Sequence, residues 1–327
     1  DQMVVSNMPV AETKAAAGPR KATTFEPSPK MSSYLLFLAM GDFERVSQTV
    51  AGEDVGVVVR RGDTEKAKYA LDATVKLIPY FNDWFGTPYP LPKLDLVAGP
   101  GRSQFFAAME NWGAIFYFDY AILIDPKLST EADRQNVFVT VAHEVAHAWF
   151  PHVGKVERAE ENWLSESLAD YTSAVCVQRM DTRNGKARFD RQLADWKYAA
   201  RQISPNASIY LAAHLGSAEN DARDWQALLY AKGPLVLHAI REELARTAGG
   251  RAEGDRLFFT WLRSYIKNFT FKTGETRHLI GILSQMTKRD WHPWFERYVY
   301  GSAEVVGLMC LRVFVDGEQR RYDELAP

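Results

Sequence analysis

The chain has 327 residues, of which 46% are hydrophobic and 24% charged, enough for a sizeable core and a water-exposed surface. Its formal net charge of −2 argues against a nucleic-acid binder, which needs a basic face. No apolar run approaches the roughly 18 residues of a membrane helix, and the length suits a main domain with a smaller one.

Cysteine usage and the first residues say little about the compartment. Cys176 and Cys310 lie far apart in apolar segments, which favours two buried thiols over a disulfide. The chain begins Asp-Gln-Met-Val-Val, without an initiator methionine in first place and without a secretory pattern. We expect a soluble protein of unknown compartment, with the cytoplasm favoured over a periplasmic or secreted location.

The first part of the chain predicts a small mixed sheet. Residues 1–30 are rich in Ala, Pro, Lys and Thr, which suggests an extended leading segment with little packing of its own. Tyr34–Met40 is interpreted as a buried strand. The other runs of β-forming residues predict strands over 43–50, 55–60, 94–98 and 115–124.

A helix interrupts these strands, and helices dominate from Thr130 onward. Apolar residues repeat at three and four from Ala67 to Phe85, which predicts a helix that begins after Asp63 and stops at Gly86. We therefore expect an α+β fold, a mixed sheet lobe followed by a mostly helical lobe. The predicted parts are 1–30 (extended segment), 31–128 (sheet lobe), 129–301 (helical lobe) and 302–327 (a C-terminal strand or tail, strand-like over Val305–Val315).

The strongest chemical signal is the sequence His143-Glu-Val-Ala-His147. Its two histidines are four residues apart, so on a helix both imidazoles share one side, with Glu144 beside them. This is the His-Glu-x-x-His pattern, in which two neutral imidazoles bind zinc and the glutamate acts on the metal-bound water. The alternative is a pair of structural histidines. The core-facing side is already supplied by an apolar stripe, which consists of Val137, Val141, Val145 and Ala148.

A third ligand is expected from the next predicted helix. A catalytic zinc site with two histidines needs one more protein ligand and a free position for water. Glu166 lies opposite the apolar stripe Leu164, Leu168, Tyr171 and Val175, so it meets that need. Asp170 shares its face and would hold a ligand histidine by the second ring nitrogen. Taken alone, Glu166 would be an ordinary solvated glutamate.

Four motifs in order resemble the aminopeptidase N family of zinc metallopeptidases, within the gluzincins. Eighteen residues separate His147 from Glu166, and Trp163-Leu-Ser-Glu166 resembles the family's Trp-Leu-Asn-Glu. Ala107-Ala-Met-Glu-Asn111, followed by Trp-Gly, resembles its Gly-Ala-Met-Glu-Asn exopeptidase motif. Tyr230-Ala-Lys-Gly233 resembles its Tyr-x-Lys-Gly segment. The resemblance runs from about Ser6 to Gly301, including Asn7-Met-Pro-Val10, and implies a thermolysin-like catalytic domain.

The resemblance implies a role for each motif residue. One Zn2+ per chain would be held by His143, His147 and Glu166, with Glu144 as general base and Tyr230 as hydrogen-bond donor to the oxyanion. Glu110, with help from Glu166, would bind the charged amine of a substrate with a free N-terminus. The backbone at Ala108 and Gly113 would contact the substrate. Gly233 is expected to be the N-cap, and Pro234 to lie in the first turn, of the helix just after Tyr230. Gln104, Phe105 and Phe106 either line the first pocket or belong to the core.

Several features depart from the family. Ala107 replaces a glycine, Ser165 an asparagine, and Ser173 stands where a glutamate is frequent. The stretch 151–161 differs from the aromatic-rich sequence that is usual in the family. Family members ordinarily have an all-β domain before the catalytic domain and a further domain after it, and neither fits in this chain.

These departures keep alternatives open beside an aminopeptidase that acts on peptides. One is another gluzincin reaction, such as an endopeptidase or a hydrolase of a non-peptide substrate. The other is a zinc-binding domain that is inactive and serves as a scaffold.

Overall fold

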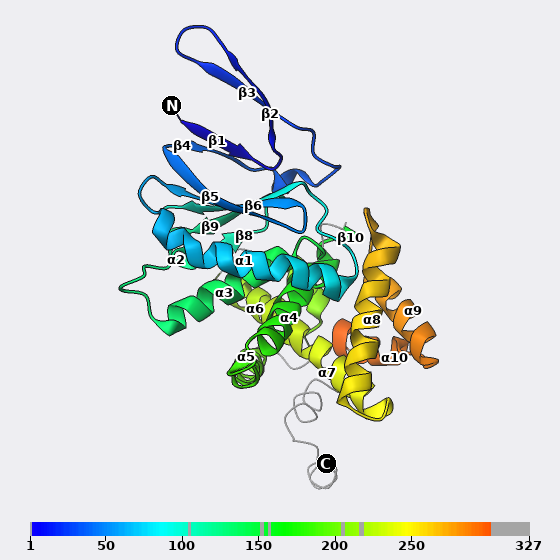
Figure 1. Cartoon of the computed structure of the whole chain (residues 1–327). Coiled ribbons are helices and arrows are strands. Elements are labelled where there is room, and N and C mark those ends of the chain that lie inside the picture. Colours follow the sequence, from blue (N-terminus) through cyan, green and yellow to red (C-terminus); the bar gives the residue numbers. More distant parts are fainter. Residues whose placement is uncertain are drawn as a thin grey trace. The chain divides into compact units, whose positions relative to one another are not determined.

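The computed structural model describes residues 2–103, 106–150, 154–155, 158–203, 207–215 and 219–301. The chain divides into two compact units, residues 1–152 and 153–327 (Figure 1). The boundary lies after the helix that carries His143, and not near residue 128, because that helix packs against the long helix of the first unit. Gln104, Phe105, Cys310 and the predicted strand 305–315 lie outside the described residues.

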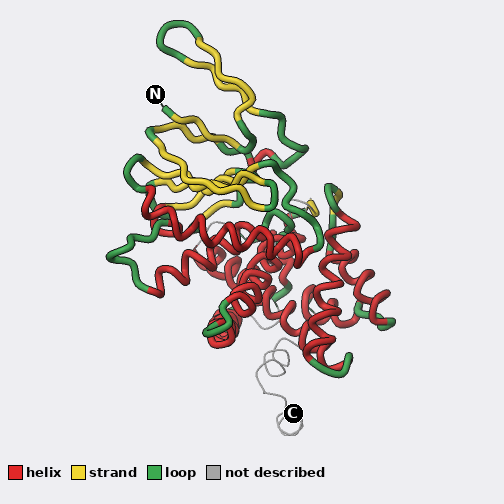
Figure 2. The backbone as a smooth tube through the Cα atoms, in the orientation of Figure 1, coloured by secondary structure: helices red, strands yellow, loops and turns green. Residues whose placement is uncertain are grey.

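A mixed five-stranded sheet organises the first unit (Figure 2). Its order is β5 (Phe43–Val50), β6 (Glu53–Arg60), β7 (Lys93–Gly99), β9 (Ala114–Phe118) and β8 (Ala108–Met109). The central pairs β6/β7 and β7/β9 are parallel, whereas both outer pairs are antiparallel. Every residue of β7 is buried, as expected for a strand covered on both faces. This sheet unit and the helical unit after it confirm the predicted α+β fold.

The two faces of the sheet are covered differently. Helix α1 (Thr64–Phe85) lies along one face and ends at Gly86 in the left-handed conformation, as predicted (Figure 1). On the opposite face, β1 (Met3–Ser6) pairs with β4 (Leu38–Gly41), and Val5 packs against Val58 and Val97 of the sheet. Part of the leading segment therefore contributes to the core, while β2 (Val10–Ala15) and β3 (Lys21–Phe25) form a mostly exposed hairpin.

Two strand predictions in this unit are wrong in part. Tyr34–Met40 is not a buried strand. The turn η1 (Ser33–Leu35) precedes the short β4, and the side chains that are 52–68% exposed are those of Tyr34, Leu36, Leu38 and Met40. The run Tyr34–Met40 is apolar throughout, but in the folded protein only Leu35 of it is buried. The strand predicted over 115–124 ends at Phe118, where Asp119 begins the one-turn helix α2 (Asp119–Ile122) and pairs with Arg60.

Helices make up most of the second unit (Figure 2). The longer ones are α4 (Trp163–Met180), α5 (Gly185–Ala200), α6 (Glu219–Ala227), α7 (Gly233–Thr247), α8 (Arg251–Phe269) and α9 (Thr276–Thr287). The shorter ones are η2 (Ala159–Glu161), η3 (Ile209–His214), η4 (Leu228–Lys232), α10 (His292–Phe295) and η5 (Glu296–Tyr300). A small parallel pair joins β10 (Gly154–Lys155) to β11 (Lys272–Thr273).

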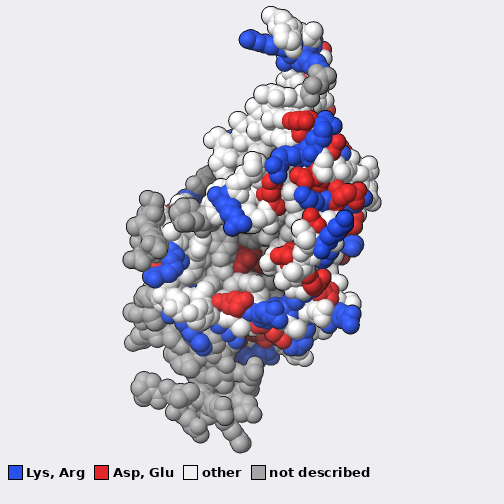
Figure 3. Space-filling model, turned by 90° about the vertical axis from the view of Figure 1, so that its left-hand side faces the viewer, with Lys and Arg blue, Asp and Glu red and all other residues white. Residues whose placement is uncertain are grey.

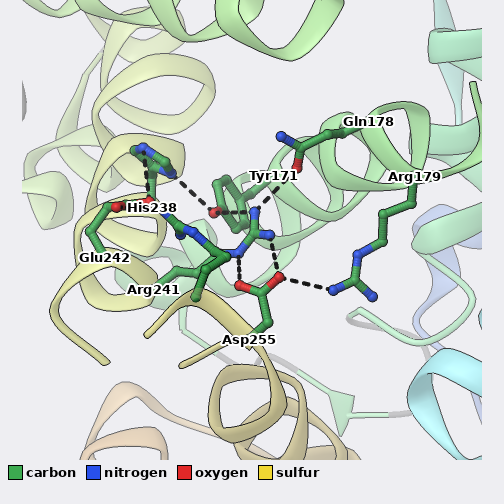
Figure 4. A network of polar contacts seen from close by, with 8 residues as sticks. Tyr171, Gln178, Arg179, His238, Arg241, Glu242 and Asp255 are labelled. Atoms are coloured by element: carbon green, nitrogen blue, oxygen red, sulfur yellow. Dashed lines mark hydrogen bonds and ion pairs between the residues drawn. The ribbon is translucent and has the colours of Figure 1, made fainter. Parts of the chain in front are cut away.

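A buried polar network ties α4, α7 and α8 together (Figure 4). Arg241 makes a two-pronged ion pair with Asp255, both distances 2.7 Å, and Asp255 also accepts from Arg179. The Tyr171 hydroxyl lies 3.2 Å from Nδ1 of His238, which is 8% exposed and whose pKa falls to about 4 through burial. The charged groups acting on His238 are Glu242, which raises its pKa, and Arg241, Arg251 and Lys197, which lower it.

Lys and Arg side chains are interspersed with Asp and Glu on the face seen in Figure 3. In the described part of the chain, we find no helix with the length and apolar character that crossing a membrane requires.

Candidate active site

Helix α3 (Glu131–Ala146) carries the first motif histidine, His143, and the second, His147, directly follows it. It begins with a capping box, in which the Thr130 hydroxyl accepts from the Asp133 N–H and the Asp133 carboxylate accepts from the Thr130 N–H. Its predicted stripe, Val137, Val141 and Val145, is buried to within 2%. The helix ends at Ala146, which leaves His147 as its C-cap. Opposite this stripe, His143 is partly exposed, whereas Glu144 and His147 are themselves buried.

Aromatic packing fixes the end of this helix. Trp149 donates its indole N–H to the Thr87 carbonyl at 2.9 Å, just beyond α1. Its ring lies 5.5 Å from Phe81 and 5.4 Å from Phe85, and Phe150 meets Phe85 edge-on at 5.2 Å. These contacts hold the last turn of the motif against α1, so the histidines stand on a rigid support.

The two imidazoles face each other through their Nε2 atoms, which are 3.1 Å apart. His147 is 1% exposed, and its Nδ1 donates to the Phe150 carbonyl at 2.6 Å. Because a carbonyl only accepts, that contact fixes the proton on Nδ1 and makes Nε2 the unprotonated nitrogen, as a metal ligand requires. Two Zn–N bonds of about 2.0–2.1 Å at a tetrahedral angle separate their nitrogens by about 3.3 Å. The pair therefore fits a zinc ion.

Two carboxylates lie next to His147. Glu110, Glu144 and His147 each offer a ligand atom, and these atoms lie within 4.8 Å of one another. Both glutamates are at least 92% buried. Two buried carboxylates at this spacing favour a cation between them, either a metal ion or a protonated amine. Tyr117 is fully buried, and burial together with the Glu144 charge raises its pKa well above the usual value and keeps the phenol neutral.

Glu110 lies in a tight turn between β8 and β9. The Asn111 N–H donates to the Met109 carbonyl at 2.8 Å, and the Ala114 N–H to the Asn111 carbonyl at 3.1 Å. The Tyr34 hydroxyl donates to Glu110 Oε1 at 3.3 Å. Tyr34 is a contact that sequence reasoning missed, because 76 residues separate the two side chains.

Ala108 and Gly113, whose backbone was predicted to contact the substrate, both make backbone contacts within the protein. Ala108 is 7% exposed and pairs with Tyr117 in the sheet. Gly113 has a φ of +79°, and a Cβ there would lie 2.2 Å from the Asn7 carbonyl oxygen. Its own carbonyl accepts from Lys93 Nζ and from the Asp95 N–H. The glycine is thus required by internal packing, and its carbonyl is engaged within the protein.

In the second unit, Glu166 and Asp170 share one face of α4. Of the residues from Trp163 to Val177, only these two are not buried. The predicted apolar stripe on the other side is at most 1% exposed at each of its four residues, Leu164, Leu168, Tyr171 and Val175. The helix therefore directs both carboxylates away from its packed side, as its sequence predicts.

Tyr230 donates its hydroxyl to Glu166 Oε2 at 2.6 Å. It lies in η4, a π-helical turn that runs directly into α7, so Gly233 is the first residue of α7 and not its N-cap. The Gly233 N–H reaches back to the Leu228 carbonyl, and Pro234 has no N–H to offer the Tyr230 carbonyl in the usual α-helical bond. That missing donor gives a physical reason for the π-turn.

The side chain of Asp170 has a partner within its own unit. Its Oδ2 accepts from the Trp196 indole N–H at 2.9 Å. For His147, the Phe150 carbonyl already fills the orienting role that we had expected of Asp170. An interaction of Asp170 with His143 stays a prediction.

Comparison with known proteins identifies the family. The family profile described as "Peptidase family M1 domain" matches residues 69–298. This chain belongs to peptidase family M1. Its match includes both histidines, Glu144, Glu166 and Tyr230. The resemblance inferred from the four motifs is thereby confirmed.

Relatives in this family carry aminopeptidase names. The chain is 34% identical over 289 residues to "Aminopeptidase M1-C" of Oryza sativa subsp. japonica, which covers 87% of this chain and 31% of that protein. It is 44% identical over 175 residues to the "Puromycin-sensitive aminopeptidase" of Caenorhabditis elegans (53% and 18%). It is 39% identical over 171 residues to "Aminopeptidase N" of Acetobacter pasteurianus (52% and 48%). The chain thus spans about a third of the first of these relatives.

Proposed function

We propose that this M1 chain carries the catalytic machinery of a zinc-dependent aminopeptidase that releases N-terminal residues from peptides. The observation that carries the proposal is the facing pair of imidazole Nε2 atoms, 3.1 Å apart, with the carboxylates of Glu110 and Glu144 beside His147. Family membership and the names of the relatives support it.

The proposed zinc ligands are His143, His147 and Glu166. The histidines fit because the proton of His147 is held on Nδ1 by the Phe150 carbonyl. Glu166 is proposed from its spacing after His147 and its place on the open face of α4. When bound, zinc polarises the substrate carbonyl and lowers the pKa of a coordinated water towards neutrality.

The residues of the chain divide the remaining chemistry. The Glu144 carboxylate accepts a proton from the attacking water and later delivers it to the leaving amine. Tyr230 donates its phenolic hydrogen bond to the oxyanion that develops on the former carbonyl oxygen. Its 2.6 Å hydrogen bond to Glu166 supports this role, because it places the hydroxyl beside the proposed third ligand.

Glu110 accounts for the preference for an N-terminus. A free α-amine has a pKa of about 8 and is mostly charged at neutral pH. Glu110 is 8% exposed and its carboxylate is close to that of Glu144, so it offers a buried partner for that amine beside the general base. A substrate anchored in this way presents its first peptide bond to Glu144. Glu166 contributes to the same amine site.

The test is a panel of fluorogenic substrates with free or acetylated N-termini, assayed with and without a zinc chelator. We expect cleavage of the free aminoacyl compounds only, lost with chelator and restored by Zn2+. Preferred cleavage of blocked peptides would point to an endopeptidase instead. Stoichiometric zinc without turnover would support the scaffold alternative.

A further inference from the structure

Lys93 is a buried ammonium group whose three hydrogens are all engaged. It is 6% exposed, and its Nζ donates to the Ser6 carbonyl at 2.7 Å, to Asp95 Oδ2 at 2.8 Å and to the Gly113 carbonyl at 2.8 Å. A charge of this kind is retained in a core only with such complete pairing. Lys93 therefore joins three segments: β1, β7 and the turn that carries Glu110.

Asn7 donates a hydrogen bond to the preceding carbonyl of the same turn, that of Trp112. It is 3% exposed, and its amide nitrogen donates to the Trp112 and Leu35 carbonyls, both at 2.8 Å. Its Oδ1 accepts from the Phe37 N–H at 2.9 Å. Asn7 follows Ser6, the residue held by Lys93, so the two side chains hold consecutive carbonyls, those of Trp112 and Gly113, from one place.

The position of Glu110 depends on Asn7 and Lys93, which bind the carbonyls of Trp112 and Gly113 in its turn. On its upstream side, Met109 is paired with Phe116 in the sheet, and on its downstream side the turn closes at Ala114. Between them, Asn111 is buried, and the next two carbonyls are those bound by Asn7 and Lys93. Misplacement of a binding group by about 1 Å is enough to lower a rate by about 10²-fold.

We propose that Lys93 and Asn7 are positioning residues, which hold the 109–113 turn so that the Glu110 carboxylate meets the substrate amine. The inference rests on the proposed function, because it takes Glu110 as the amine partner. Neither residue touches the substrate. Their effect is on amine recognition and not on zinc or on proton transfer by Glu144.

The chain offers a matched control in Arg45. Arg45 binds the other oxygen of the same aspartate, with Nε 2.7 Å from Asp95 Oδ1, and a second ion pair joins it to Asp54 at 3.0 Å. Arg45→Met and Lys93→Met each take one cation from Asp95. Only Lys93→Met removes the bond to the Gly113 carbonyl.

The experiment compares wild type, Lys93→Met, Asn7→Asp, Arg45→Met and Glu110→Ala. The readouts are KM and kcat for a free aminoacyl substrate, the ratio of kcat/KM for free against acetylated substrate, zinc content, and hydrogen exchange of the peptide that covers the turn. We expect Lys93→Met and Asn7→Asp to raise KM and lower the ratio by about 10-fold or more, with zinc content unchanged and faster exchange in the turn. Arg45→Met should keep the ratio within about twofold of wild type.

Failure of this inference and failure of the proposed function give different results. If wild type and Glu110→Ala behave as proposed but Lys93→Met and Asn7→Asp keep the wild-type ratio, the positioning role is refuted. It is refuted equally if Arg45→Met lowers the ratio as much. If wild type shows no aminopeptidase activity, the proposed function fails. In that case hydrogen exchange alone tests the positioning role, which is refuted if the turn exchanges as slowly in Lys93→Met and Asn7→Asp as in wild type. If Lys93→Met does not fold, Asn7→Asp decides.

Discussion

Gly233→Ala tests whether the position of Tyr230 depends on the packing of the π-turn. A Cβ at Gly233 would lie 1.9 Å from Oγ and 2.5 Å from Cβ of Ser167. Rotating the hydroxyl away breaks its 2.6 Å bond to the Leu229 carbonyl, at a cost of about 1 kcal/mol. The contact between the two Cβ atoms remains, and ordinary carbon contacts of about 3.5–4.0 Å require a backbone shift of about 1 Å.

That shift has two measurable consequences. Overpacking should lower the free energy of unfolding by about 1–3 kcal/mol, against the gain of about 1 kcal/mol that alanine normally brings within a helix. Displacing Tyr230 by about 1 Å should lower kcat by about 10²-fold, with little change in zinc content. The measurements are denaturant unfolding and steady-state kinetics on a free aminoacyl substrate.

The chain supplies a control at Gly281 in α9, where an added Cβ would meet nothing within 4 Å. Gly281→Ala should stabilise the protein by roughly 0.5–1 kcal/mol and leave kcat unchanged. Adding Ser167→Gly to Gly233→Ala removes both contacting atoms and should recover part of the lost kcat. If Gly233→Ala behaves like Gly281→Ala in both assays, the packing argument for Tyr230 is refuted.

Three further predictions concern single groups. Glu110→Ala should weaken discrimination between free and acetylated N-termini; an unchanged ratio would remove Glu110 from the amine site. Tyr230→Phe should lower kcat by on the order of 10²-fold or more with little change in KM, and a wild-type kcat would contradict its role. Burial lowers the pKa of His238 from 6.5 to about 4, so below pH 6.5 the unfolded chain binds a proton that the folded protein does not. The free energy of unfolding should therefore fall between pH 6.5 and pH 4, by up to about 3 kcal/mol. His238→Gln should flatten that dependence in denaturant unfolding across pH, whereas the exposed His292→Gln should not; equal slopes in both variants would refute the assignment.

Local periodicity predicted the helices that carry the site. The stripes on α3 and α4 follow from apolar spacing alone, and they left His143 and Glu166 on the unpacked sides. The π-turn at Tyr230 was not predicted, because a proline just after a glycine is read as a helix start. Its cause is an N–H that Pro234 lacks, an effect on the turn before it.

Contacts between distant segments could not be predicted from the chain. The bonds from Asn7 to Trp112 and from Lys93 to Ser6 span 105 and 87 residues. No spacing rule connects such residues, so the support of the Glu110 turn became visible only in the folded structure. The exposure of Tyr34, Leu36 and Leu38 could not be predicted for the same reason, because an apolar run indicates burial but not which segments would cover it.

The most direct test of the account is Glu144→Gln, assayed for zinc content and turnover together. Glutamine keeps the shape of the side chain but cannot accept the water proton. The account predicts one zinc ion per chain, as in wild type, with nearly all hydrolysis of free aminoacyl substrates lost. Retained turnover, or loss of zinc along with activity, would contradict the assignment of Glu144 as the base beside a His143–His147 metal site.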